Sequence, residues 1–181
     1  LNLAGNFVNA GTFLGSSSIA GGTAIISAAN ITNLQSGSII SSNALNLVLS
    51  TPGVLSNFGT IASGGNLTIA ASSIVNGPGS IMQAQGNIAA IATASSIFNA
   101  GLIQSITGNV TFAQSAVLAS VDTGTAALLS NVNSQLSSEF LLNNTGGDIK
   151  GNNISIIASG LTELVNVTGG NLISDALNIT A

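Results

Sequence analysis

The sequence carries very little charge. Five acidic residues and one lysine are its only charged side chains among 181 residues, for a net charge of −4. All six lie in the last third of the chain, at Asp122, Glu139, Asp148, Lys150, Glu163 and Asp175. A free monomer normally needs a far more charged surface to stay in solution. The composition therefore favours a shaft, a filament or a larger assembly.

A single cation also excludes two classes of partner. Nucleic-acid binding requires a basic surface that neutralises phosphates, and binding to an anionic membrane surface requires a polybasic patch. No apolar run in the sequence reaches the ~18 residues that a membrane-spanning helix needs. The sequence therefore predicts no nucleic-acid partner and no membrane insertion.

Cysteine, histidine, tryptophan and tyrosine are all absent. Without cysteine the chain has no disulfides and no thiol chemistry. Without histidine it lacks the commonest general base and the commonest metal ligand. We therefore expect no catalytic residue, no cofactor and no metal site.

What the chain does have is a repeat of about 22 residues. The stretch 65–71, Gly-Asn-Leu-Thr-Ile-Ala-Ala, recurs in related form at 86–91 and 108–113. The asparagines that lead these copies and their weaker relatives form a first column: Asn43, Asn66, Asn87, Asn109, Asn131 and Asn153, continued by Asp175. A fixed period of this length is typical of a repeat architecture in which each unit stacks on its neighbour.

A second column keeps pace with the first. Its members are Asn9, Asn33, Asn57, Asn76, Asn99, Asp122, Asn144 and Asn166. A bulky apolar residue lies two positions before most of them, a glycine follows, and another apolar residue comes after it. These later apolar positions are Phe13, Ile39, Ile61, Ile81, Ile103 and Ile149.

Apolar and small polar residues alternate in segments of three to five residues, which is the period of a half-buried strand. Glycine and asparagine separate the segments and suit sharp corners. Three short strands and three corners per repeat predict a single all-β domain over residues 1–181, a parallel β-helix of about eight coils. The crossover rule makes it right-handed.

Both asparagine columns are expected to be internal ladders, in which each amide donates to the next one along the stack. Buried amides cost free energy unless they are paired, and a ladder pairs them. On this interpretation, replacing Asn87 by Ala would deprive the buried amides of Asn66 and Asn109 of a partner.

Residues 113–142 fit the repeat least well. Leu128, Val132, Leu136 and Phe140 follow one another at a spacing of four, as on a helix face. Against a helix, Asn109, Asn131 and Asn153 keep a spacing of 22. Two interpretations stay open here: an uninterrupted coil, or a helix or long loop.

Residues 97–103 (Ile-Phe-Asn-Ala-Gly-Leu-Ile) followed by 108–113 (Gly-Asn-Val-Thr-Phe-Ala) resemble the haemagglutinin-type repeats of bacterial filamentous haemagglutinins. The resemblance covers most of residues 30–113 well and residues 147–181 moderately. It implies a right-handed β-helix shaft at an extracellular or cell-surface location. It also implies a role in adhesion or fibre formation, with a cell-surface or glycan partner.

An enzyme is a less favoured alternative, because polysaccharide-acting enzymes also use β-helices. Glycoside hydrolysis needs two carboxyl groups about 5–10 Å apart. Asp122 and Asp148, or Glu139 and Glu163, could lie on adjacent coils. No histidine, arginine, tyrosine or tryptophan accompanies them, so we interpret these carboxylates as structural.

An ice-binding surface is the other alternative. It would need a flat, regular array of threonine or other small polar side chains on one face. Thr68 and Thr111 share a repeat position, but Ala89 and Ser155 interrupt that column.

The favoured function is a non-enzymatic fibre subunit or adhesin shaft. Residues 1–3 and 177–181 begin and end in mid-pattern, as expected for a mature product or a piece of a longer protein. Leu3 lies 22 positions before Ile25, in register with the repeat. We therefore expect head-to-tail association of copies through the two ends, at Leu1, Leu3, Leu177 and Ile179.

Overall fold

The computed structural model describes residues 1–15, 21–50, 52–93, 96–114, 142–157 and 165–180. Over these residues the chain is entirely β, with 21 strands and no helix. The strands form three sheets of seven strands each, and all neighbouring strands are parallel. The all-β class, the parallel solenoid architecture and the presence of asparagine ladders are confirmed.

The first sheet contains β1 (Phe7–Asn9), β4 (Ile31–Asn33), β7 (Val54–Asn57), β10 (Ser73–Asn76), β13 (Ile97–Asn99), β16 (Leu142–Thr145) and β19 (Val165–Thr168). The second contains β2 (Thr12–Gly15), β5 (Ser38–Ser41), β8 (Thr60–Ser63), β11 (Ile81–Ala84), β14 (Leu102–Ser105), β17 (Asp148–Lys150) and β20 (Asn171–Ile173). The third contains β3 (Thr23–Ala28), β6 (Ala44–Leu49), β9 (Leu67–Ala71), β12 (Ile88–Ala92), β15 (Val110–Gln114), β18 (Asn153–Ile157) and β21 (Ala176–Thr180).

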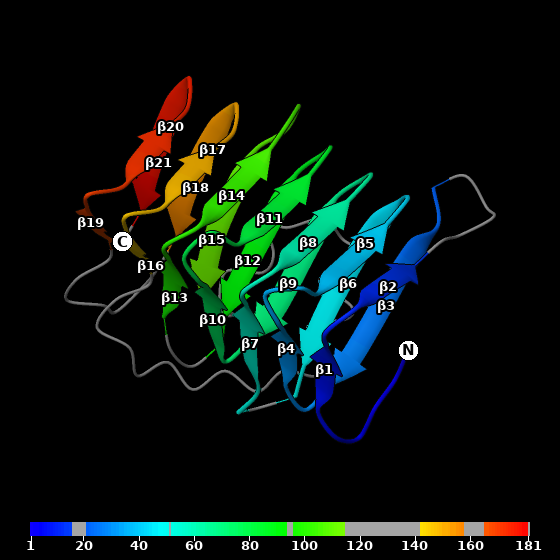
Figure 1. Cartoon of the computed structure of the whole chain (residues 1–181). Helices are drawn as coiled ribbons and strands as arrows, with labels where there is room; N and C mark the ends of the chain where they lie inside the picture. The colour runs from blue at the N-terminus through cyan, green and yellow to red at the C-terminus, as the bar shows by residue number, and fades with distance from the viewer. Residues whose placement is uncertain (16–20, 51, 94–95, 115–141, 158–164, 181) are drawn as a thin grey trace.

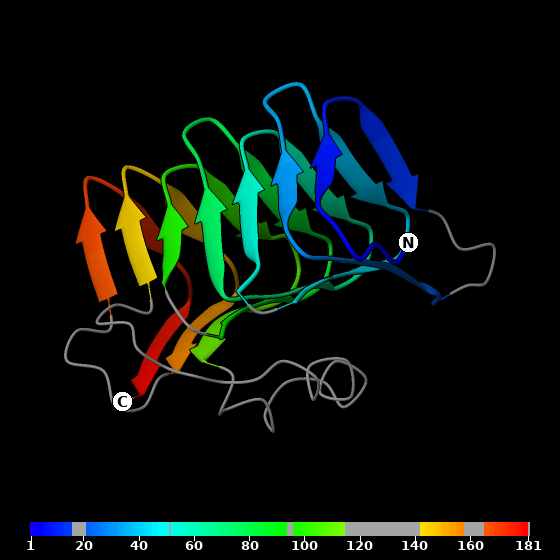
Figure 2. The ribbon, with the colours of Figure 1, turned by 90° about the horizontal axis from the view of Figure 1, so that it is seen from below.

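The chain visits the three sheets in turn, so every third strand returns to the same sheet one coil further on (Figure 1). The N-terminal strands lie at one end of the stack and the C-terminal strands at the other. Figure 2 shows the same stack from below, with successive coils side by side. The molecule is therefore a solenoid whose axis runs across the strands.

The structure has fewer coils than the sequence predicts. Seven strand triplets make about six turns, not eight coils. Six steps of about 4.8 Å place the first and last strands of a sheet about 29 Å apart. The missing coil was predicted around Asn131, but β15 pairs directly with β18, bringing Val110 opposite Ile154. A helix, loop or coil was expected over residues 113–142. Of these, residues 113–114 belong to β15 and residue 142 begins β16, and residues 115–141 lie outside the described residues.

Alternating side chains from the three sheets fill the interior. One inner column of the third sheet runs through Ile26, Leu47, Ile69, Ala90, Phe112, Ile156 and Ile179. From Ile26 to Ile156 its members are at most 1% exposed. Because each strand contributes the same position to the same column, a repeat in the sequence becomes a continuous apolar core.

One inner column differs from the sequence prediction by one residue. Met82, not Ile81, continues the column from Ile61 to Ile103. Met82 is buried, whereas Ile81 lies half-buried on the outer face. The corner between Asn76 and β11 holds four residues, against two between Asn57 and β8, and this difference changes which residue points inward.

Glycines fit the corners between the first and second sheets for two different reasons. A Cβ at Gly59 would collide with the carbonyl oxygens of Gly37 and Leu34. Gly79 instead adopts a φ of 73°, in the left-handed region that side chains rarely occupy. Close stacking of coils therefore restricts the corner sequence as strongly as it restricts the core.

The N-terminal segment, residues 1–3, lies beside β3 at the edge of the third sheet and joins it through an isolated bridge. Asn2 pairs with Ser27, so Leu3 lies opposite Ala28 and the predicted register of Leu3 with Ile25 is wrong. The offset is 25 residues, not 22, because the first coil is longer than the average repeat.

Core packing can be tested with Ile69→Ala. Ile69 is fully buried between Leu47 and Ala90 in its column, so the variant should lose about 2–5 kcal/mol of unfolding free energy in urea titrations, from lost burial and a residual cavity. Ser56→Ala changes a half-buried side chain on the outer face of the same coil, and should cost under about 0.5 kcal/mol. Equal losses would contradict the assignment of inner and outer faces.

Candidate functional site

The second asparagine column is a buried amide ladder. Nδ2 of each member donates to Oδ1 of the next, at 2.8, 2.8, 2.8, 2.8 and 2.7 Å. The members, in order, are Asn9, Asn33, Asn57, Asn76, Asn99 and Asn144. Asn9 is 8% exposed and the others are fully buried. All bonds point the same way, so the ladder has a direction from the N-terminal end to the C-terminal end.

Each amide also fixes the corner that follows it. Nδ2 of Asn57 donates to the carbonyl oxygen of Ile81 on the next coil at 3.0 Å, while its Oδ1 accepts the backbone N–H of Gly59 at 3.3 Å. An amide group has two donor hydrogens and an oxygen with two lone pairs. The ladder therefore uses nearly all of its capacity, which is what burial of an amide demands.

The first column is exposed, and the expectation that it forms a buried amide ladder is wrong. Asn66, Asn87 and Asn109 lie at the corner before the third sheet, with their side chains in solvent. Oδ1 of Asn66 accepts the backbone N–H of Asn87 at 2.9 Å, and Oδ1 of Asn87 accepts that of Asn109 at 2.9 Å. Asn43 is half-buried, and Asn131 lies outside the described residues.

The next step in this column skips the predicted member. Asn109 Oδ1 accepts both the backbone N–H and the Nδ2 of Asn153, at 3.2 and 2.9 Å. Asn131 was expected between them. Asn109 directly precedes β15 and Asn153 begins β18, and these two strands are paired. The column is therefore continuous from Asn109 to Asn153.

The buried ladder also ends earlier than predicted. Asn99 bonds directly to Asn144, so the ladder continues from one to the other without the predicted member between them, Asp122, which lies outside the described residues. At the C-terminal coil Val167 takes the column position next to Asn144. Asn166 instead lies on the outer face, where its Nδ2 donates to Oδ1 of Asn143 at 3.0 Å.

Sequence analysis missed a row of buried serines at the corner between the second and third sheets. Ser41, Ser63 and Ser105 occupy one column and are at most 6% exposed. Ser63 Oγ donates to the carbonyl oxygens of Asn43 and Asn66, both at 2.8 Å. The signal was a serine two positions after each inward-facing isoleucine, which places it on the inner side of the strand.

The threonine column considered for ice binding is confirmed as a column on the outer face of the third sheet. Thr68 pairs with Ala89, and Ala89 with Thr111. Thr68 and Ala89 are only 5% and 8% exposed, however. Side chains this buried do not present a flat surface to ice.

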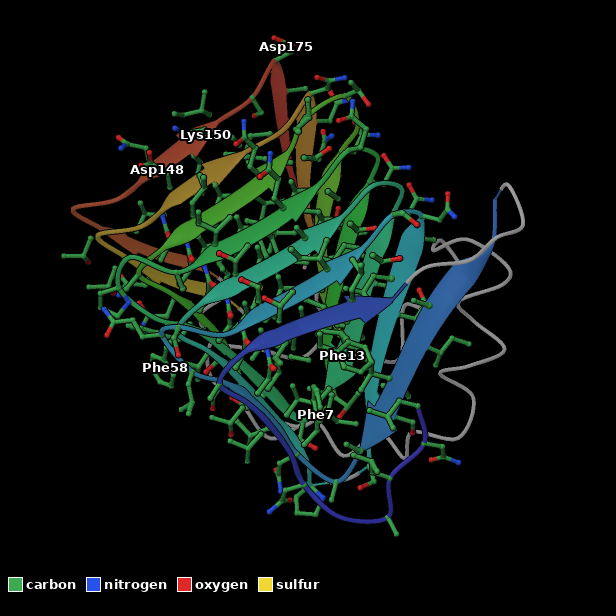
Figure 3. All side chains as sticks on the ribbon, turned by 45° about the vertical axis from the view of Figure 1, so that its right-hand side comes forward. Phe7, Phe13, Phe58, Asp148, Lys150 and Asp175 are labelled. Carbon is green, nitrogen blue, oxygen red and sulfur yellow. The ribbon has the colours of Figure 1, made fainter. Side chains whose placement is uncertain are left out.

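Charge is concentrated at the C-terminal end of the stack, where Asp148, Lys150 and Asp175 lie (Figure 3). Lys150 Nζ lies 3.0 Å from Asp148 Oδ2, and Asn171 Nδ2 donates to Asp148 Oδ1 at 2.8 Å. The hydrogen bond from Asn171, then that from Lys150, lowers the pKa of Asp148 below its ordinary value of 3.8, with a smaller opposing effect of burial and a further lowering by the lysine charge.

These groups do not assemble an active site among the residues that the structure describes. Asp148 is engaged by Lys150 and Asn171. Its proposed catalytic partner Asp122 and the pair Glu139 and Glu163 lie outside the described residues. In the described part of the chain no three acidic, histidine or cysteine side chains gather as metal ligands.

A shallow groove of about 420 Å³ follows the corner between the first and second sheets near this end. Its lining includes Gly79, Ser80, Ile81, Gly101, Leu102 and Asp148. The walls are apolar or small, and Asp148 is their one charged group. The groove offers a surface for contact but no set of groups that could carry out a reaction.

No family model, curated protein or solved structure matches the chain. The resemblance to filamentous haemagglutinin repeats therefore stays a prediction from the repeat pattern. None of the described residues belongs to a helix long and apolar enough to cross a membrane.

The two columns can be separated by a pair of alanine variants. Asn57→Ala should cost about 2–4 kcal/mol of unfolding free energy, because it removes the acceptor nearest to Asn33 Nδ2, the acceptor of the buried N–H of Gly59 and the donor to the carbonyl oxygen of Ile81. Asn87→Ala should cost about 1 kcal/mol or less, because water replaces its bond at the exposed corner. A larger loss for Asn87→Ala in urea titrations would refute the assignment of the buried ladder.

The Asp148 contacts predict a weak acid sensitivity. The pKa of Asp148 is lower in the folded than in the unfolded chain. The stabilisation that its contacts give the fold is therefore complete above the unfolded pKa and is lost as pH falls through the folded pKa. The melting temperature should therefore drop more below pH 3.8 for the parent chain than for Asp148→Asn. Asn171→Ala should resemble Asp148→Asn, since Asn171 is the largest cause of the shift. Asn178→Ala, a control on the neighbouring β21, should behave like the parent.

Proposed function

We propose that the chain is a structural, non-enzymatic rod, wound as a right-handed β-helix, which serves as a fibre subunit or adhesin shaft in an extracellular or bacterial cell-surface setting. Support comes from its interior, where the described coils repeat the same apolar columns and those from Asn9 to Asn144 share one amide ladder. In these columns buried apolar side chains and amides pack against their own kind from coil to coil. The right hand is the hand that parallel crossovers almost always adopt.

The observation that carries end-to-end association is the uncovered core at the C-terminal coil. Leu177 and Ile179 occupy the inner columns of Ile154 and Ile156, which are fully buried. At the end of the stack the same two positions are 48% and 51% exposed. Burying them against the N-terminal coil of another copy would remove apolar surface from water and pair the free strand edges. A repeated contact of this kind is open-ended and produces fibres.

The two other candidate functions have weaker support. Ice binding needs an exposed, regular column, but Thr68 and Ala89 are buried while Thr111 is half-buried. Polysaccharide cleavage needs a pair of carboxyl groups, and Asp148 is already bonded to Lys150 and Asn171. Contact with a cell surface or a glycan is compatible with a shaft, and the groove beside Asp148 is one described surface where it could occur.

A charge at the exposed end of the core tests this function. Leu177→Lys should abolish or strongly shorten fibres seen by negative-stain electron microscopy and sedimentation, because stacking would bury an unpaired charge. The rod itself should stay folded, since Leu177 is half exposed in the single chain. Asn178→Lys is the matched control: the same charge on the same strand points outward, beside Ser155 on β18, and should leave fibres intact.

Two results would count against the proposal. If the parent chain stays monomeric at high concentration, with only particles about 29 Å long along the axis, stacking is wrong and only the shaft interpretation survives. If Leu177→Lys and Asn178→Lys form fibres equally well, the C-terminal core is not the contact surface.

A further inference from the structure

The N-terminal segment, residues 1–3, is bonded to the edge of the third sheet. The N–H of Leu3 donates to the carbonyl oxygen of Ser27 at 2.8 Å, and the N–H of Ser27 donates to the carbonyl oxygen of Leu1 at 2.9 Å. The amino group of Leu1 donates to the carbonyl oxygen of Ile25 at 2.8 Å. The segment thus occupies the position that the next strand of a continuing third sheet would take.

The two ends of the solenoid therefore differ in shape. At the C-terminal end the three sheets finish together, with β19, β20 and β21 in one coil. At the N-terminal end the first and second sheets finish with β1 and β2, while the third extends one strand further through the segment. The N-terminal end has a step of one strand, and the C-terminal end has no matching gap.

This step prevents a second copy from docking on all three sheets at once. If the segment pairs with β21 of a neighbour, the neighbour's β19 and β20 stay one extra strand spacing, about 4.8 Å, away from β1 and β2. The first and second sheets are then interrupted, and their edge N–H and C=O groups stay unpaired. If β19 and β20 pair with β1 and β2, then β21 and the segment compete for the edge of β3.

We propose that residues 1–3 form a displaceable edge strand that must leave β3 before another copy of this chain can stack on it. In the stacked state β21 of the neighbour takes the segment's place, while its β19 and β20 pair with β1 and β2. The inference rests on the proposed end-to-end association. It adds that the N-terminal segment limits assembly and that its release is the step that permits growth.

The exchange replaces a weak contact with a much larger one. The segment loses three backbone hydrogen bonds, whereas the new contact pairs three strand edges. It also covers the end of the core, where the rings of Phe7 and Phe13 meet edge-on with centroids 5.4 Å apart (Figure 3). Val165 and Leu172 of the neighbour continue the columns of these two rings, and Ile179 continues that of Ile26.

A disulfide that locks the segment in place tests the proposal. The chain has no cysteine, so the Asn2→Cys, Ser27→Cys double variant contains a single thiol pair. Paired positions on neighbouring parallel strands lie about 4.8 Å apart, within the range that a disulfide spans. The oxidised variant should form no fibres and the reduced variant should form them like the parent, measured by light scattering and electron microscopy. The reduced form is the control for the two substitutions themselves.

Deletion of residues 1–3 should act in the opposite direction. Because three backbone bonds no longer have to be broken, the critical concentration for fibre formation should fall about tenfold or more. The melting temperature, measured at a concentration below assembly, shows that the shortened rod is folded.

The outcomes separate this inference from the function on which it rests. If oxidised and reduced variants assemble equally, the segment is not displaced and the inference is wrong, while end-to-end association stands. If neither the reduced variant nor the deletion assembles at high concentration although both are folded, end-to-end association is itself wrong, and the inference falls with it.

Discussion

The structure depends on one constraint, which is that parallel strands stack in register from coil to coil. Each side chain then lies between two residues that occupy the same position on the neighbouring coils. An apolar column meets this constraint by packing, and a polar column meets it only if one side chain can both donate to and accept from a copy of itself. Asparagine can, and the bonds of 2.7–2.8 Å from Asn9 to Asn144 show the result.

The same constraint explains why the described coils carry so few charged side chains. A charged inner column would place like charges about 4.8 Å apart, and the charged side chains of the described residues do not lie in the inner columns. Asp148 and Lys150 illustrate this, because both are on the outer face and neutralise one another. The proposed shaft function therefore rests on the length of the stack and on the properties of its two ends.

Much of the fold follows from the sequence, because alternation and period are direct consequences of strand geometry and stacking. The burial of Asn33 could be deduced, since it lies two positions after the inward-facing Ile31. The same rule should have placed Asn66 outside, because it immediately precedes the inward-facing Leu67. The two columns have the same period, so the period alone does not distinguish them. What distinguishes them is whether the asparagine lies an even or an odd number of positions from an inward-facing residue on its strand. The coil count failed for a related reason: Asn131 has the spacing of a ladder residue, but spacing does not show that β15 pairs directly with β18.

The ends could not be deduced from the repeat, because a repeat describes only what neighbouring coils share. Register at the N-terminus depends on the length of the first coil. Asn2 pairs with Ser27, 25 positions later, and not with the residue 22 positions later. Composition at the C-terminus breaks the ladder, since Val167 stands where the next amide would be. A neighbour stacked on this coil would continue the apolar columns and the backbone pairing but not the amide ladder. Strand edges and apolar side chains, not asparagine, would therefore hold the joint between copies, and the joint would be weaker than the steps that the amide ladder links.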